Sequence, residues 1–300
     1  MLRNKKNYKV MALVSKKSIS IIITSYNDFR AINLIKYLRN LNPFEIIVAD
    51  GGSKDDLVSE FKKLEDEIVK FYLLPGNIAE TRYKVQNLIK GDITVFIDTD
   101  EIPKKGWLNL LTEPIEEGYC DFTFGPTVPI KPATSRYSKY LDDYDAFLYG
   151  NVLEHDILKG AMGNSAWLTE IVKEIGFDPC LGIGGEDYDL TIRAVKFGYK
   201  GKFIKDAVLG HDQNSIKTFR KFVRKIFYNY LVGASLVYRK NKMLFTRGSA
   251  SVSANTTFKD PLEILVYLLK PVALVFSLML NPWEDKRYCQ SQKTKETEEF

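Results

Sequence analysis

The chain has 300 residues, of which 45% are hydrophobic and 27% are charged. These fractions exclude a disordered chain and predict a folded protein with one main domain and an appendage. The net charge of +5 is too small to indicate nucleic-acid binding, so we expect no nucleic-acid partner.

The cysteines Cys120, Cys180 and Cys289 are far apart in the sequence and form no CxxC pair. This spacing argues against a disulfide framework and against a structural zinc site, and it favours a reducing compartment. The N-terminus is basic, but its apolar stretch at residues 10–14 is too short for a signal peptide core. We therefore expect the body of the protein in the cytoplasm.

The N-terminal third alternates between strand and helix patterns. β-Branched runs alternate with segments of helical spacing, and this alternation predicts an α/β fold whose mostly parallel sheet is flanked by helices. Ligands bind such sheets beyond the carboxyl ends of the strands. The predicted strands are 18–24, 45–49, 68–74 and 93–97, and the predicted helices are 28–40, 55–64 and 77–90.

The regular alternation stops after Asp100. Residues 101–160 contain several prolines and many tyrosines and acids, so we expect a loop-rich insertion that shapes a substrate site. A helix is predicted near residues 165–175, another begins near Asp187, and residues 203–209 have the composition of a strand.

Polar residues follow three of the predicted strands, at 24–27, 50–53 and 98–100. Asp98 and Asp100 are separated by one residue, and such a pair can hold Mg²⁺ or Mn²⁺ together with a diphosphate bound to the ion. The alternative is that these aspartates are ordinary turn residues. Arg82 falls in the helix after the third strand, where the alternative is a solvated helix residue.

A second acidic cluster lies at residues 184–190. Here Asp187 is a candidate general base that accepts a proton from an attacking hydroxyl. The alternative is that Glu186 and Asp187 only complement the dipole at the start of a helix. His211 follows further on, and it is either a structural histidine or a side chain that completes a metal site.

The chain resembles the family-2 inverting glycosyltransferases of the GT-A fold, a Rossmann-like α/β fold. The resemblance covers roughly residues 18–212, with His211-Asp212 at the place of a late histidine near the metal. Its other motifs are TSYN at 24–27, ADGGSKDD at 49–56, GNIAETR at 76–82, DTD at 98–100 and GGEDYDLTIRAVKFGYKGKFI at 184–204.

The resemblance implies a role for each matched residue. Asp187 would be the catalytic base, Glu186 would shape the acceptor site, and Asp100 and His211 would bind Mn²⁺ or Mg²⁺. Asp50 would hydrogen-bond the base of the donor nucleotide, and Asp98 would lie near its ribose. The other substrate-binding residues would be Thr24, Tyr26, Asn27, Gly51, Arg82 and Thr99.

The implied reaction is metal-dependent transfer of one sugar, with inversion, from a UDP- or GDP-linked donor to a hydroxyl acceptor. Processive members of this family carry a Q-x-x-R-W motif. The residues after Gln213 do not complete this motif, which argues for the addition of one sugar per encounter. A glycolipid or polyprenyl-linked saccharide is the expected acceptor, and transfer to a polyprenyl phosphate is the alternative. An ionised phosphate needs no base, so the pair Glu186-Asp187 favours a hydroxyl.

Two other functions fit parts of the pattern. A sugar nucleotidyltransferase would share the α/β layout, but residues 24–27 lack a glycine-rich phosphate loop. A non-catalytic membrane adaptor with a transferase-like fold would have no need of Asp98, Asp100 and Asp187, all of which are present.

The C-terminal segment predicts contact with a membrane. No acid lies between Asp212 and Asp260, and residues 216–234 combine an apolar helical stripe with cations, as in helices on anionic lipid. The alternative is a helix packed on the catalytic domain.

Residues 261–280 are long enough to span a bilayer, but Lys270-Pro271 favours a monotopic hairpin or a re-entrant segment. A homo-oligomer interface is the alternative. We thus expect the protein to lie at the cytoplasmic face of a membrane. The expected division is a basic lead at 1–17, a catalytic domain at 18–214, a helical region at 215–283 and a disordered tail at 284–300.

Overall fold

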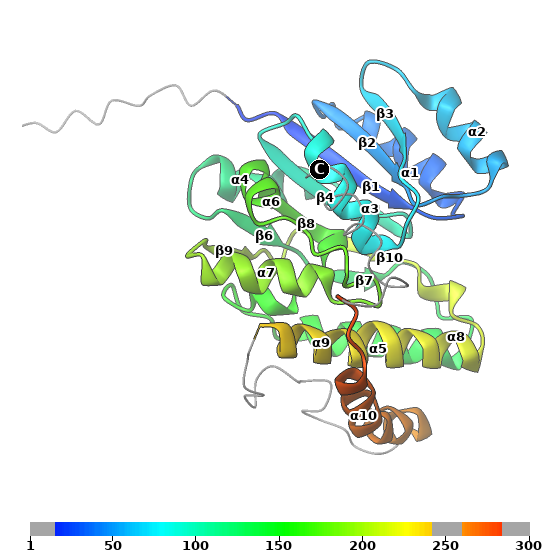
Figure 1. The fold of residues 1–300 in the computed structure, drawn as a ribbon. Coiled ribbons are helices and arrows are strands. Elements are labelled where there is room, and N and C mark those ends of the chain that lie inside the picture. The colour runs from blue at the N-terminus through cyan, green and yellow to red at the C-terminus, as the bar shows by residue number, and fades with distance from the viewer. Residues whose placement is uncertain (1–15, 242–259, 284–300) are drawn as a thin grey trace, which may run out of the picture.

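A computed structural model describes residues 16–241 and 260–283, and Figure 1 shows its fold. A seven-stranded sheet with the order β3-β2-β1-β4-β8-β6-β9 lies at its centre. The first four strands along the chain are parallel neighbours, whereas β8 runs antiparallel to both of its neighbours. The strands are β1 (Ile19–Ser25), β2 (Glu45–Asp50), β3 (Val69–Leu73), β4 (Ile93–Asp98), β6 (Phe122–Phe124), β8 (Ser165–Leu168) and β9 (Gly201–Phe203).

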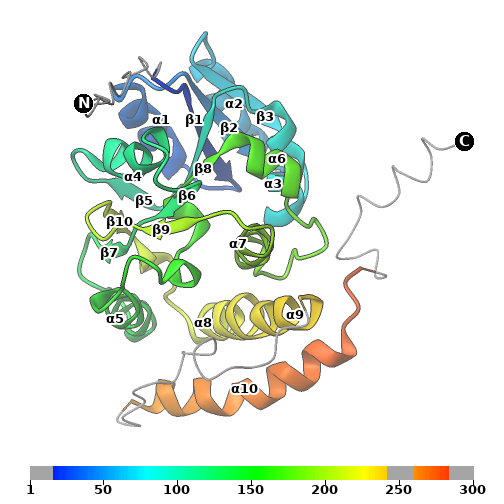
Figure 2. The ribbon, with the colours of Figure 1, turned by 90° about the vertical axis from the view of Figure 1, so that its left-hand side faces the viewer.

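Helices cover both faces of this sheet because its central strands are apolar on both sides. Ile21 and Ile23 of β1 are fully buried in one core with α1, α2 and α4, and Ile22 is buried in a second core with α3, α6 and α7. Figure 2 shows the layers from the side. The helices are α1 (Arg30–Arg39), α2 (Asp55–Leu64), α3 (Ile78–Val85), α4 (Trp107–Glu116), α6 (Thr169–Ile175) and α7 (Glu186–Lys196).

A three-stranded sheet lies beyond the end of β4. Its strands are β5 (Glu101–Pro103), β7 (Thr127–Pro129) and β10 (Leu209–His211), and β10 is central. Because β10 runs antiparallel to β5, His211 lies opposite Glu101 in the register. The small sheet thereby brings a late histidine next to the residues that follow β4.

The C-terminal helices form a layer under the central sheet in the view of Figure 1. One continuous helical run changes from α to π geometry and back, and α10 packs against its outer side. A third core joins this layer to the rest through Leu181 and Ile192. The elements are α5 (Arg136–Gly150), α8 (Phe219–Arg224), the π-helical segment η5 (Lys225–Val232), α9 (Gly233–Lys240) and α10 (Pro261–Met279).

The strand and helix order predicted up to residue 97 is confirmed. Asn77 caps α3, as expected: its side chain accepts a hydrogen bond from the backbone N–H of Glu80, and the Glu80 side chain accepts one from the backbone of Asn77. The predicted helix at 77–90 is shorter, because α3 ends at Val85 and a 3₁₀ turn follows at Gln86–Leu88.

Two element predictions after residue 100 are wrong, and a third has a different start. Residues 101–160 are not loop-rich, since they include the strands β5, β6 and β7 and the helices α4 and α5. The helix predicted near residues 165–175 is present as α6 but begins at Thr169, because Ser165–Leu168 forms strand β8 between β4 and β6. The strand expected at 203–209 is two strands in two sheets, β9 and β10.

Most of the apolar stripe of the basic helical run faces inward, although Phe219 is exposed. Ile226 is buried in the third core and Val223 and Tyr230 pack against that core, so the alternative of a helix packed on the catalytic domain is the one observed. Residues 261–280 form one helix up to Met279 rather than a hairpin, with Pro271 inside it. The expectations for residues 1–15, 242–259 and 284–300 lie outside the described residues.

One of the two described cysteines departs from the expected reduced state. Cys120 is free and buried, and burial raises the pKa of its thiol to about 12. Cys180, in contrast, takes part in a disulfide. The cysteine spacing therefore gives no firm argument for a reducing compartment.

Candidate functional site

A cavity of about 900 Å³ opens where β1 and β4 end. Ligand cavities at the carboxyl ends of strands are typical of α/β sheets. Parts of the chain that are far apart in the sequence contribute to its wall. The predicted site residues that line it are Thr24, Arg82, Asp98, Thr99, Asp100, Glu186, Asp187 and His211.

Asp100 and His211 face each other in this cavity. Asp100 lies in the turn between β4 and β5, and β10 brings the Nε2 atom of His211 to 3.6 Å from its Oδ2 atom. Burial raises the pKa of Asp100, but the neighbouring His211 outweighs burial and lowers the pKa to about 2. Burial lowers the pKa of His211, but Asp100 and Asp145 outweigh it and raise the pKa to about 10.

This pair fits a divalent cation that also binds a ligand from solution. The Nδ1 atom of His211 faces the Oδ2 atom of Asp145 at 3.4 Å, and metal-bound histidines typically pair their second nitrogen with such a carboxylate. Within the described ranges no group of three or more His, Cys, Asp or Glu side chains could hold a metal ion. An ion held by Asp100 and His211 would complete its coordination with oxygens from outside the chain, such as those of a phosphate.

Arg82 joins two of the acidic segments. Its guanidinium is 4% exposed and donates from Nη1 to Glu186 Oε1 at 2.6 Å and from Nη2 to Asp98 Oδ1 at 3.1 Å. The capped start of α3 fixes the direction in which Arg82 points. In this structure the arginine therefore connects the end of β4 to the start of α7.

The start of α7 presents Glu186 and Asp187 to the cavity. Gly185 precedes the helix with φ of 88°, a backbone conformation that favours glycine, and so the chain can turn sharply there. Burial and the charge of Asp187 raise the pKa of Glu186 to about 7, although Arg82 acts in the opposite direction. A carboxyl group that titrates near neutrality inside a cavity is typical of a functional site.

A comparison with known protein families identifies the family to which the chain belongs. A family model described as glycosyl transferase family 2 matches residues 20–176, which is more than half of the 300 residues. The chain belongs to glycosyl transferase family 2. The matched segment includes the strand-end motifs and Arg82, and it ends before Asp187 and His211.

Two curated relatives are similar to part of this family-2 chain. Chondroitin synthase of Pasteurella multocida (strain Pm70) is 29% identical over 123 residues, which are 38% of this chain and 13% of the synthase. TuaG of Bacillus subtilis (strain 168), assigned to teichuronic acid biosynthesis as a glycosyltransferase, is 25% identical over 150 residues, 48% of this chain and 60% of TuaG. The chain thus spans less than two thirds of either relative.

Solved structures show that the family-2 chain has the GT-A fold. A mannosyltransferase from Pyrobaculum calidifontis, solved with GDP-Man and Mn²⁺, superposes with a TM-score of 0.56 at 17% identity, over 92% of this chain and 77% of that one. A mycobacterial protein superposes with a TM-score of 0.52 at 18% identity, over 74% of each chain.

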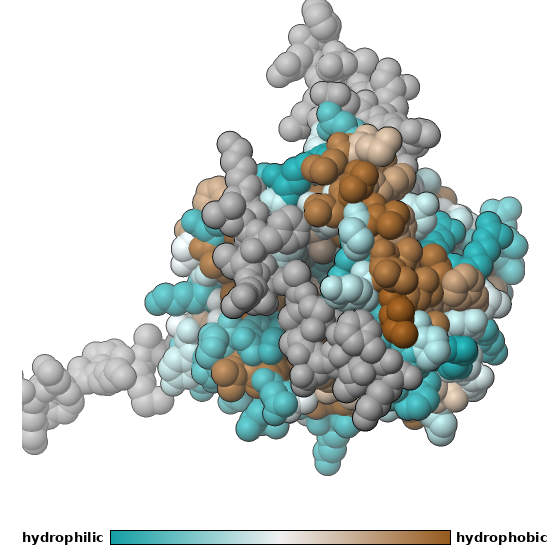
Figure 3. Space-filling view, turned by 90° about the horizontal axis from the view of Figure 1, so that it is seen from below, coloured by the Kyte–Doolittle hydropathy of each residue, from teal (hydrophilic) through white to brown (hydrophobic). Residues whose placement is uncertain are grey.

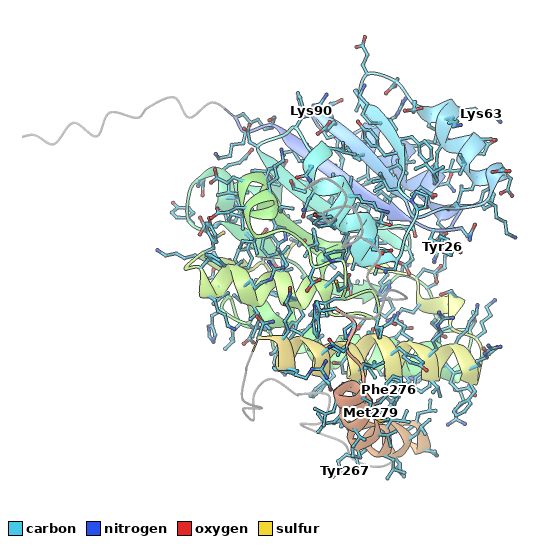
Figure 4. All side chains as sticks on the ribbon, viewed as in Figure 1. Tyr26, Lys63, Lys90, Tyr267, Phe276 and Met279 are labelled. Carbon is cyan, nitrogen blue, oxygen red and sulfur yellow. The ribbon has the colours of Figure 1, made fainter. Side chains whose placement is uncertain are left out.

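Four predicted residues of the family-2 site lie outside the cavity wall: Tyr26, Asn27, Asp50 and Gly51. Tyr26, labelled in Figure 4, is 66% exposed. Asp50 is fully buried, and its carboxylate accepts hydrogen bonds from the backbone N–H groups of Gly52 and Ser53 and from the Ser53 hydroxyl. In this conformation the Asp50 carboxylate stabilises its own turn, and Asp50 is not among the residues that line the cavity.

Several residues of the site were not predicted from the sequence. Asp145 of α5 holds His211, and Arg30 of α1 lies with its Nη2 atom 3.8 Å from Asp100 Oδ2. Glu101 is buried beside Asp98, and burial together with the charge of Asp98 raises the pKa of Glu101 well above its usual range. The sequence held only a weak signal for them, since each is an acid or an arginine among many and only the fold brings them together.

Proposed function

We propose that this chain is a metal-dependent inverting glycosyltransferase, which moves one sugar from a UDP- or GDP-linked donor to a hydroxyl acceptor. The observation that carries the proposal is that Asp100 and Asp187 line one cavity, although 87 positions separate them in the sequence. The donor and the metal would lie on the side of β4, and the acceptor hydroxyl on the side of α7. The mannosyltransferase that shares the fold was solved with GDP-Man and Mn²⁺, which supports this class of donor and ion.

Asp187 is the proposed base. Its carboxylate would accept the proton of the acceptor hydroxyl while the oxygen attacks the anomeric carbon from the side opposite the diphosphate, so that the configuration inverts. Glu186 and Arg82, joined by the 2.6 Å contact, would position this residue and the donor. A hydroxyl needs such a base, which favours a saccharide acceptor over a polyprenyl phosphate.

Asp100 and His211 are the proposed ligands of Mn²⁺ or Mg²⁺. When bound there, the ion would offset the charge that grows on the departing diphosphate. The facing pair of Asp100 and His211, with Asp145 behind the imidazole, supports this assignment. Asp98, Thr99 and Thr24 line the same part of the cavity and would contact the nucleotide.

The test is a screen of UDP- and GDP-linked sugars with Mn²⁺ for release of nucleoside diphosphate, followed by the variant Asp187→Asn. We expect Asp187→Asn to abolish transfer and to leave binding of the nucleotide unchanged. Asp56→Asn is a matched control, since Asp56 and Asp187 each accept a hydrogen bond from the backbone N–H of the next residue in the first turn of a helix. Full turnover by Asp187→Asn would show that Asp187 is not the base. If the chain bound no donor at all, the alternative function of a non-catalytic adaptor would be favoured.

We further propose that α10 lies on a membrane surface and that the acceptor is lipid-linked. Within the part of the chain that the structure describes, α10 is long and apolar enough to cross a bilayer. One side of the helix packs on η5 and α9, while Leu268, Val275 and Met279 on the other side are 60%, 57% and 80% exposed. Figure 3 shows this hydrophobic band, and Figure 4 labels Tyr267 and Met279 on the helix.

Sedimentation with anionic lipid vesicles tests the proposed surface. We expect the full chain to sediment with vesicles and the double variant Leu268→Gln, Val275→Gln to stay in solution, while Phe44→Gln, at an exposed phenylalanine before β2, binds as the wild type does. A dimer that lacks lipid binding would contradict the proposal. A location at the cytoplasmic face requires that the chain binds lipid without the Cys180 disulfide. Sedimentation of a reduced sample with the same vesicles checks this requirement.

A further inference from the structure

The helical run from α8 to α9 forms one wall of the cavity, although it lies outside the segment matched by the family model. Its middle part, η5, is an eight-residue π-helix. π-Helical turns are rare and frequently lie at functional sites. The cavity-lining residues of this run are Lys225, Asn229, Tyr230, Ala234 and Tyr238.

The π-helical turns explain why these side chains share one face. Lys225 and Tyr238 would point about 140° apart on a regular α-helix, which has 3.6 residues per turn. In a π-helix the backbone hydrogen bonds join residues five apart, so side chains four or five positions apart fall in line. Lys225, Asn229 and Tyr230 lie in the π-helical segment and follow this longer spacing, and Ala234 and Tyr238 continue the wall in the α-helix that follows. The unusual backbone thus aims Lys225 into the cavity.

Close backbone contact holds this wall against the start of α7. A Cβ atom added at Gly233 would lie 2.7 Å from the backbone carbon and oxygen of Gly184. Gly185 is equally close, since a Cβ atom there would lie 2.8 Å from a side-chain carbon of Val237. The wall and the segment that carries Asp187 therefore keep one relative position.

Lys225 differs from the other cations of the run. Lys221 and Arg224 are exposed, whereas Lys225 is half-buried and lines the cavity. Its ammonium donates to Gln213 Oε1 at 3.1 Å, and the Gln213 amide donates to Asp145 Oδ2 at 2.8 Å. Asp145 is also the carboxylate behind His211. This chain of contacts places the ammonium on the metal-binding side of the cavity.

We infer that Lys225 binds the diphosphate of the donor, an inference that rests on the proposed function. A divalent ion neutralises only part of a diphosphate, and the departing group gains charge as the bond to the sugar breaks. A lysine supplies a compact positive charge to such a group. The other lysine and arginine side chains at the described cavity wall already have carboxylate partners: Arg82 is held by Asp98 and Glu186, and Lys159 by Asp156. Lys225 is therefore the cation that is left to meet the diphosphate.

Calorimetric titration of the full chain with UDP and GDP in the presence of Mn²⁺, and then with UMP and GMP, tests this role. Lys225→Met keeps the length of the side chain and removes its charge. We expect this variant to bind the better diphosphate about 10- to 100-fold more weakly and the monophosphate unchanged, because only the diphosphate carries the second phosphate. Lys225→Arg should restore most of the loss. Arg224→Met, at the preceding exposed residue, should bind as the wild type does.

Each other outcome has a distinct meaning. Unchanged diphosphate binding by Lys225→Met would overturn the inference and leave the proposed function intact. An equal loss for mono- and diphosphate would also overturn it, because that pattern indicates a structural role through Gln213. A wild-type chain that binds neither UDP nor GDP would overturn the proposed function itself.

Discussion

The charge of Glu186 couples the stability of this protein to pH. The side chain is 5% exposed, and its Oε1 atom accepts a hydrogen bond from Arg82 at 2.6 Å. Burial and the charge of Asp187 raise the pKa from 4.5 to about 7, while Arg82 opposes this shift. The folded state therefore binds a proton at Glu186 more tightly than the unfolded state does.

The sign and the size of the effect follow from this difference. A group whose pKa is higher in the folded state stabilises the protein below the unfolded value, and the contribution is lost as the pH rises through the folded value. For Glu186 this window runs from pH 4.5 to about 7. A shift of one pKa unit corresponds to about 1.4 kcal/mol, and part of the window lies below pH 5, so the free energy of unfolding falls by about 2–3 kcal/mol between about pH 5 and pH 8.

The variant Glu186→Gln removes the titration and keeps an oxygen that accepts from Arg82. We expect its free energy of unfolding, relative to the wild type, to rise by about 2–3 kcal/mol from about pH 5 to pH 8. The measurement is urea unfolding followed by tryptophan fluorescence, without metal or nucleotide. Glu170→Gln is the matched control, because Glu170 is also an acid in the first turn of a helix but is exposed.

A stability difference between Glu186→Gln and the wild type that is the same at every pH would refute this reasoning. It would mean that Glu186 stays ionised throughout and that its contact with Arg82 outweighs burial. A pH dependence of equal size in Glu170→Gln would also refute it, since the effect would then come from the position at the start of a helix.

Two further predictions concern packing and the metal. Gly233→Ala should destabilise the protein by about 1–3 kcal/mol in urea unfolding, because its Cβ would lie 2.7 Å from the backbone of Gly184, whereas Gly150→Ala, with no atom within 4 Å, should cause little change. Asp145→Asn should weaken binding of Mn²⁺ in the presence of nucleoside diphosphate by about 10- to 100-fold, because the carboxylate that faces His211 is lost. Unchanged Mn²⁺ affinity, measured by titration, would show that Asp145 does not support the ligand.

Local patterns were enough to predict the parallel half of the sheet. The strand at residues 18–24 is a run of β-branched residues bounded by polar ones, and the structure places β1 at Ile19–Ser25. The motifs after β1 and β4 could be predicted for the same reason, because the edge at which a parallel strand ends follows from chain direction alone. Strand β8 was missed because four residues carry too little pattern, and its neighbours β4 and β6 decide its conformation.

The sequence by itself determined the fold class, the family and four of the acids that line the cavity, namely Asp98, Asp100, Glu186 and Asp187. The tertiary structure alone decided how those acids pair: Arg82 between Asp98 and Glu186, Asp145 behind His211, and Lys225 aimed inward by a π-helical turn. The physical reason is the distance along the sequence between the residues that interact. A strand or a capped helix is selected by neighbours within a few residues, whereas a buried ion pair depends on where distant segments come to rest.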